Sequence, residues 1–162
     1  MSGDDLSTEA APPDVRHLFE AYRGSLPPEG RPDLAGAFSF GDTPALADTL
    51  ADLVCVGEKT ATAEAKWTVE AAGEPLPEPG DHWVVLDGDG EPRCVIRTER
   101  VEVVPFVDVT PDHAAAEGES DGSLASWRLA HVRYYQRTLP EGRSFDPEMP
   151  VVCERFRVVY RA

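Results

Sequence analysis

Residues 57–62 read GEKTAT, and this short stretch decides how the chain folds and where its chemistry could lie. A helical segment ends at Gly57, and an alternating, strand-like segment begins at Thr60. Between them stands Lys59, one of only two lysines in a chain that has thirteen arginines. A desolvated lysine can lose its proton and act as a base or nucleophile, which arginine cannot do. We therefore take Lys59 as a candidate catalytic residue, and the alternative is an exposed lysine in a turn.

The residues before this motif predict the best-defined helix of the chain. Thr43 supplies an N-cap, and Pro44 follows at the first helical position. Gly57 suits the left-handed position just past the helix end. After the motif, alternating threonine and alanine predict a strand over residues 60–69. The apolar stripe of the helix comprises Leu46, Leu50, Leu53 and Val54.

The other periodic segments complete an α+β pattern. Helices are expected after Pro13, over residues 111–117 with Gly118 as the closing residue, and over residues 123–138. A turn at residues 88–90 joins two strands in a hairpin over residues 82–104, and residues 151–160 form a closing strand. We expect Val101 and Val103 to line the core, and Trp127, Ala130 and Tyr134 to share one side of their helix. This order predicts a small, mainly antiparallel, barrel-like sheet flanked by helices.

The chain length and charge limit the possible classes of function. The 162 residues suit one domain, here residues 13–162, after a polar tail at residues 1–12 that we expect to be disordered. The sequence has neither a secretory signal pattern nor an apolar run of about 20 residues, so we expect a cytoplasmic protein without a membrane span. The net charge of −15 disfavours nonspecific binding to duplex nucleic acid. The acidic composition would also suit a high-salt cytoplasm.

Cysteine and histidine spacing predicts no structural metal, and we expect no cofactor. Cys55, Cys94 and Cys153 are odd in number and far apart, which argues against a disulfide framework. We expect them to be reduced, buried and apolar in behaviour. The four histidines form neither an H-x-x-x-H pair nor a zinc pattern with cysteine.

Six segments together resemble one known family. In order they are FSFGD at residues 38–42, GEKTATA at 57–63, PGD at 79–81, HAAAEGE at 113–119, SLASWR at 123–128 and VCERF at 152–156. This set is similar to the ASCH (activating-signal-cointegrator homology) domain of the PUA-like superfamily, in its bacterial single-domain form. The resemblance implies a β-barrel flanked by helices, with a cleft suited to RNA or a nucleoside. Some members are ribonucleases, some deacetylate N4-acetylcytidine, and some are thought only to bind RNA.

The resemblance to the amidohydrolase members implies three catalytic residues. They are Lys59 and Thr62 of the GEKTAT motif, and Glu117. The Thr62 hydroxyl would attack or orient water, neutral Lys59 would accept its proton, and Glu117 would hold the ammonium or relay the proton. In a flat strand, positions 59 and 62 face opposite sides, so this arrangement requires a turn or bulge between them.

Four further residues are expected to contact substrate: Thr60, Trp67, His113 and Arg128. His113 lies four residues before Glu117 on one helical face, where an ordinary cap and a surface pair are the alternative. Aromatic side chains such as Trp67 can stack on bases, although they are more often part of a core. Arg128 belongs to a helix whose basic residues could contact nucleic acid or form a solvated face.

Three functions remain open at this point. The resemblance suggests a hydrolase without a metal cofactor, whose partner is single-stranded RNA or a modified nucleoside. The chain length is that of the longer bacterial members, which favours a ribonuclease, whereas the acidic composition favours a small nucleoside and an N4-acetylcytidine-type amidohydrolase. The third possibility is a noncatalytic RNA-binding regulatory module, in which Lys59 contacts phosphate.

Overall fold

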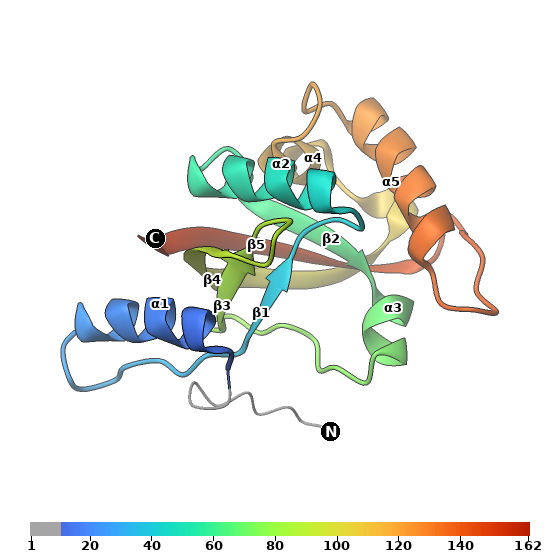
Figure 1. Ribbon diagram of the computed structural model, residues 1–162. Helices are drawn as coiled ribbons and strands as arrows, with labels where there is room; N and C mark the ends of the chain where they lie inside the picture. The colour runs from blue at the N-terminus through green and yellow to red at the C-terminus, as the bar shows by residue number, and fades with distance from the viewer. Residues whose placement is uncertain (1–10) are drawn as a thin grey trace.

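The computed structural model describes residues 11–162 (Figure 1). The predicted tail falls almost wholly on residues 1–10, which lie outside the described residues. Ala11, the first described residue, is buried. The elements in chain order are α1 (Pro13–Gly24), β1 (Gly36–Ser39), α2 (Pro44–Cys55), β2 (Ala61–Ala65), α3 (Lys66–Ala71), β3 (His82–Leu86), β4 (Pro92–Pro105), the 3-10 turn η2 (Phe106–Asp108), α4 (Pro111–Glu117), α5 (Leu124–Thr138) and β5 (Pro150–Arg161).

The strands form one curved sheet in the order β1-β3-β4-β5-β2. Only the β1–β3 pair is parallel among the described strands, and the other three pairs are antiparallel. The sheet bends into a half-barrel with β1 and β2 at its edges (Figure 1). The α+β fold with a mainly antiparallel, barrel-like sheet is thus confirmed.

Helices α1 and α2 cover opposite faces of this sheet (Figure 1). α1 buries its apolar stripe against Val84 and Val95. α2 packs instead on the other face, where Val85 and Ile96 are buried with Phe156 of β5. Neighbouring strand residues point to opposite faces, so the β3–β4 hairpin supplies both cores.

Helices α4 and α5 protect the outer edge of β2. Their core joins Trp127 and Tyr135 of α5 to Ala63 and Ala65 of the strand. The Tyr135 hydroxyl donates a hydrogen bond of 2.9 Å to the carbonyl of Ala63. An edge strand presents unpaired backbone groups, and α5 thus satisfies one of them.

The predicted helix ends are confirmed in detail. The side chains of Thr43 and Thr110 each accept a hydrogen bond from a backbone N–H of the first turn of their helices, and Ser123 does the same for α5. Gly57 and Gly118 have φ values of +82° and +66°, the left-handed conformation expected after a helix end.

Three details of the prediction are wrong. The strand from Thr60 ends at Ala65 and is followed by α3, where Lys66 and Glu70 pair at helical spacing. On α5, Ala130 is exposed and Tyr135 is buried, because the 3.6-residue period continues from Trp127 to the latter. Val103 is 42% exposed rather than in the core, and it lies beyond an irregularity in β4 after Thr98.

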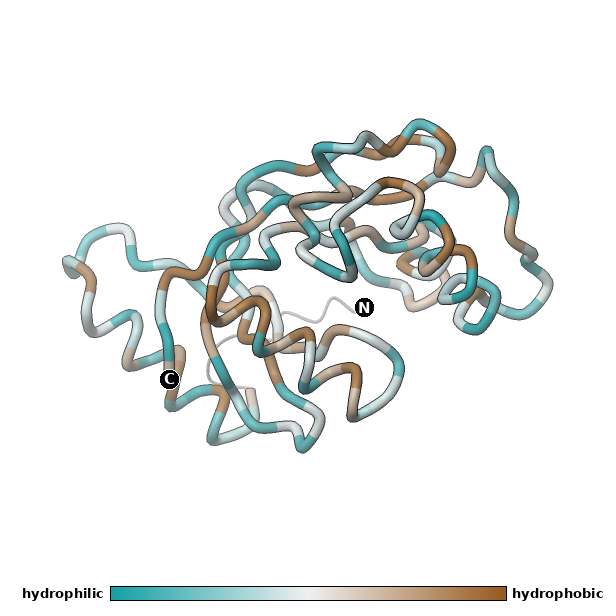
Figure 2. Tube along the Cα trace, turned by 90° about the horizontal axis from the view of Figure 1, so that it is seen from above, coloured by the Kyte–Doolittle hydropathy of each residue, from teal (hydrophilic) through white to brown (hydrophobic). Residues whose placement is uncertain are grey.

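Hydrophobic and hydrophilic residues alternate along the chain, as Figure 2 shows from above. This alternation matches elements that bury one face and expose the other. Within residues 11–162, none of the helices combines the length and the apolar character required to span a bilayer.

Candidate functional site

The first part of the candidate site is the junction between the start of β2 and the end of α4. After the turn at Gly57, the backbone N–H of Lys59 donates to the carbonyl of Leu53 in α2. The next residue, Thr60, donates from its backbone N–H (2.8 Å) and its hydroxyl (3.1 Å) to the carbonyl of Ala116. The GEKTAT motif therefore ties α2 and α4 to the segment that leads into edge strand β2.

Gly118 allows these two segments to approach so closely. A Cβ atom at this position would overlap the carbonyl of Glu58 and lie 3.1 Å from the backbone nitrogen of Lys59. Its positive φ is also strained for residues with a side chain. The glycine thus turns the chain so that Glu119 reaches Lys59.

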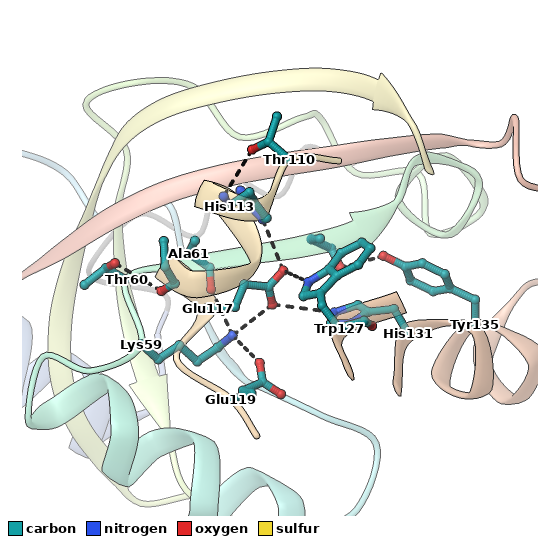
Figure 3. A network of polar contacts seen from close by, with 12 residues as sticks. Lys59, Thr60, Ala61, Thr110, His113, Glu117, Glu119, Trp127, His131 and Tyr135 are labelled. Atoms are coloured by element: carbon teal, nitrogen blue, oxygen red, sulfur yellow. Dashed lines mark hydrogen bonds and ion pairs between the residues drawn. The ribbon is translucent and has the colours of Figure 1, made fainter. Parts of the chain in front are cut away.

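Lys59 is 2% exposed, and its ammonium group is surrounded by acceptors (Figure 3). Its Nζ donates to the carbonyl oxygen of Ala61 at 2.9 Å, to Oε1 of Glu117 at 3.3 Å and to Oε2 of Glu119 at 2.7 Å. Three acceptors match the three N–H donors of an ammonium group. The ring of Phe40 lies 5.3 Å from the nitrogen.

Glu117 is 1% exposed and has four partners (Figure 3). Oε1 contacts Lys59 and lies 3.5 Å from Nε2 of His131. Oε2 accepts from Nε1 of Trp127 at 2.6 Å and lies 3.1 Å from Nε2 of His113. Burial acts to raise the pKa of Glu117, but the Lys59 charge and the two histidine contacts outweigh it and hold this pKa well below its usual range.

This network holds the charged groups of Lys59 and Glu117 in fixed positions beside an apolar core. An ionised carboxylate and an ammonium are already aligned, so neither has to reorganise when a ligand arrives. In the described residues, no group of three or more His, Cys, Asp or Glu side chains is arranged to hold a metal ion.

The second part of the candidate site is the face shared by β2 and β5. Thr62 stands directly opposite Glu154 in this antiparallel pair. Side chains of such a pair lie on one face, with Cβ atoms about 4.5–5.5 Å apart. Thr62 is partly exposed, and in the part of the chain that the structure describes its hydroxyl makes no hydrogen bond.

Aromatic contacts connect this face to Lys59. Phe40, beside the ammonium, stacks on Phe156 at 5.8 Å between ring centroids. Phe156 and Glu154 are two residues apart in β5 and therefore point to the same side. Lys59 precedes β2 in a turn, so the alternation of a flat strand does not apply to it, but in the described residues no hydrogen bond joins Lys59 to Thr62.

Two carboxyls of β2 and β5 have raised pKa values. Burial raises the pKa of Glu154, against a smaller lowering by a hydrogen bond from Thr98, and the charge of Asp81 adds to the rise. Burial likewise raises the pKa of Glu64, while the backbone N–H of Ala65 lowers it. Raised carboxyl pKa values of this kind are frequent at functional sites.

The structure gathers some of the predicted site residues and separates others. Lys59, Glu117 and His113 meet in one network, whereas Thr60 ties β2 to α4. Trp67 lies in α3 with the guanidinium of Arg143 4.2 Å from its ring centroid. Arg128 is exposed on α5 and donates to the carbonyl of Val107 at 3.3 Å. These last two side chains have no contact with Lys59 or Glu117.

Three residues of the network were not predicted as its members. Glu119 lies just past Gly118, and only the close packing of that turn brings it to Lys59. Trp127 and His131 lie on the predicted helix of residues 123–138 but were not expected in this network. Their spacing of four residues on α5 was the available signal, since it places both on one helical face. Their rings stack at 4.1 Å.

The geometry agrees with that of known proteins. The ASCH domain model matches residues 36–160. An ASCH domain from Lactobacillus crispatus JV V101 shares 33% identity at a TM-score of 0.88, covering 94% of this chain and 98% of its own. Protein EF3133 from Enterococcus faecalis V583 shares 31% identity at a TM-score of 0.79, covering 91% of this chain and 89% of its own. No curated protein matches the chain. By its sequence match and its likeness to these two structures, this chain belongs to the ASCH domain family.

Proposed function

We propose that this protein binds a modified nucleoside, free or within RNA, and hydrolyses an N-acyl group from its base, as in N4-acetylcytidine. ASCH domains are generally RNA-binding, which supports a ligand that carries a nucleobase. The observation that carries the choice of reaction is the sharing of the single Lys59 ammonium between two carboxylates.

The charge around Lys59 favours a neutral amide over a phosphodiester. Stabilising the charge of a phosphoryl transition state requires a cation that is free to face it. Lys59 is flanked by Glu117 and Glu119, and no arginine contacts these three side chains in the described residues. The chain length favoured a ribonuclease, but this acidic setting supports the amidohydrolase instead.

In the proposed reaction, water adds to the acyl carbon, the C–N bond breaks, and the base leaves with its amino group. The unpartnered hydroxyl of Thr62 orients this water. The Lys59 ammonium and the Glu117 network support this position from behind, because their buried and fully partnered contacts hold the start of β2 against α4. The leaving nitrogen takes up one proton for the one that water releases, so no net proton is gained or lost in forming the amine and the carboxylic acid.

The test is to incubate the purified protein, with a chelator, with N4-acetylcytidine and in parallel with single-stranded RNA. We expect cytidine and acetate in equal amounts from the first and no cleavage of the second. Thr62→Val, which removes the hydroxyl from a partly exposed strand position, should lower kcat about 100-fold or more with little change in thermal stability. Thr49→Val alters an exposed hydroxyl on α2 that donates only to the carbonyl of Ala45, and it is the control for the chemical change.

Each contrary result has a distinct meaning. Cleaved RNA with intact N4-acetylcytidine would support the ribonuclease. Binding of RNA without any product would support a noncatalytic module. Full activity in Thr62→Val would remove that residue from the mechanism.

A further inference from the structure

The β2–β5 face carries a polar relay for which the proposed reaction gives no role. Nε1 of Trp83 donates to Oγ1 of Thr98 at 3.0 Å, and this hydroxyl donates to Oε2 of Glu154 at 2.6 Å. The three residues come from β3, β4 and β5, so the relay crosses the middle of the sheet. It ends opposite Thr62.

The direction of the relay follows from its chemistry. An indole N–H only donates, so Thr98 accepts from Trp83, and the Thr98 hydroxyl donates its own proton to Glu154. Thr98 is 0% exposed and has no freedom to serve a ligand as well. The relay thus fixes Oε2 of Glu154 as an acceptor, while Oε1 has no hydrogen-bond partner in the described residues.

Aromatic side chains lie around the Trp83 end of the relay. The ring of Trp83 lies 5.8 Å from that of Phe38, which lies 4.8 Å from that of Phe40. Trp83 and Phe38 are only partly buried. A positioned polar group next to accessible aromatic rings is the usual composition of a site for an unstacked base.

We propose that Glu154 is the base-reading residue of this site and that it selects a base edge with a ring-nitrogen acceptor beside an exocyclic N–H donor, as in cytosine. Oε1 donates its proton to the ring nitrogen, and Oε2 accepts from the exocyclic N–H. Uracil in the same pose would set acceptor against acceptor and donor against donor. Buried polar groups left unpaired in this way discriminate strongly between ligands.

This inference rests on the proposed function for the identity of the ligand, but it concerns recognition and not turnover. It requires Glu154 in its acid form. Burial raises the pKa of Glu154, the hydrogen bond from Thr98 lowers it less, and the Asp81 carboxylate raises it further. Glu64 lies two residues beyond Thr62 and therefore on the same side of β2, and burial raises its pKa as well. Cytidine should therefore bind more weakly as the pH rises through the pKa of Glu154.

The experiment measures cytidine and uridine affinity by calorimetry between about pH 5 and pH 8. The wild type should bind cytidine at least about tenfold more tightly than uridine. Glu154→Ala should lose this preference. Glu154→Gln keeps one donor and one acceptor, so it should retain cytidine binding and lose its pH dependence. Glu148→Ala, an exposed site outside the sheet, is the matched control and should behave as wild type.

Unchanged cytidine affinity in a folded Glu154→Ala protein would overturn the inference, as would a wild type that binds neither nucleoside. If both Glu154 variants lose cytidine binding and the cytidine affinity of the wild type does not change with pH, Glu154 does not bind in its acid form. The proposed function fails separately, when the wild type binds cytidine through Glu154 but releases no acetate from N4-acetylcytidine.

Discussion

The α4–β2 junction and the β2–β5 face lie next to each other but differ in how their polar atoms are satisfied. At the junction, both oxygens of Glu117 and all three N–H bonds of Lys59 have partners. On the neighbouring face, the hydroxyl of Thr62 and one oxygen of Glu154 have none in the described part of the chain.

This difference separates a preorganised support from a surface that can accept a ligand. Fully partnered buried charges hold their geometry, whereas a partly exposed polar atom without a partner can hydrogen-bond to a ligand. Breaking the first should cost stability, and altering the second should change binding and turnover.

The largest expected difference in stability is between variants of the two lysines. Lys59→Met leaves Glu117 buried without its cation, which should lower the free energy of unfolding by about 3–5 kcal/mol in urea denaturation. Lys66→Met makes the same substitution in a surface pair with Glu70 and should cost at most about 0.5 kcal/mol. Equal losses in the two variants would mean that the buried pair has no special importance.

Two glycines test how closely α4 and the start of β2 pack at the junction. Gly57 and Gly118 both have positive φ, but only a side chain at Gly118 would overlap Glu58. Gly57→Ala should cost about 1–2 kcal/mol from backbone strain alone. Gly118→Ala adds a steric overlap and should cost more, with broadened NMR signals for residues 58–60. A smaller loss for Gly118→Ala than for Gly57→Ala would contradict this packing.

Acid titration should distinguish Glu117 from Glu154, because their contributions to the free energy of unfolding change with pH in opposite directions. The pKa of Glu117 lies below the unfolded value of about 4.3, so its contribution to stability is present above that pH and is lost as the pH falls. The pKa of Glu154 is raised, so its contribution is present below about pH 4.3 and is lost as the pH rises.

Urea unfolding from about pH 7 to pH 3 measures this difference. Relative to wild type, Glu117→Gln should lose stability less steeply toward acid, and Glu154→Gln should lose it more steeply. Equal slopes in the two variants would contradict the opposite environments assigned to them.

Local sequence signals predicted the elements that end at strong caps. Thr43, Thr110 and Gly118 each act within a few residues, so the sequence around them determines their geometry. The predicted strand was wrong over residues 66–69, where a local pattern was not sufficient. Alternation continues there, but the short helix α3 replaces the end of the strand, because burial on the sheet stops at Ala65.

The candidate site was predictable only where a family motif marked it. Lys59 and Glu117 stand in such motifs, and the structure brings them together. Glu119 also stands in a motif, but its contact with Lys59, like that of His131 with Glu117, depends on packing between segments that are far apart in the sequence. Trp67 and Arg128 were chosen for their residue type, and their positions in the fold lie elsewhere.

The three tryptophan indole N–H signals allow the most direct test of where the ligand lies. Trp83 reports the Glu154 relay, Trp127 reports the Glu117 network, and Trp67, whose ring faces the guanidinium of Arg143, is the reference. In a two-dimensional NMR titration with cytidine, the Trp83 signal should shift progressively to saturation while the Trp67 signal stays in place. A saturating shift of Trp67 with an unmoved Trp83, or no shift in any indole, would contradict a ligand on the β2–β5 face.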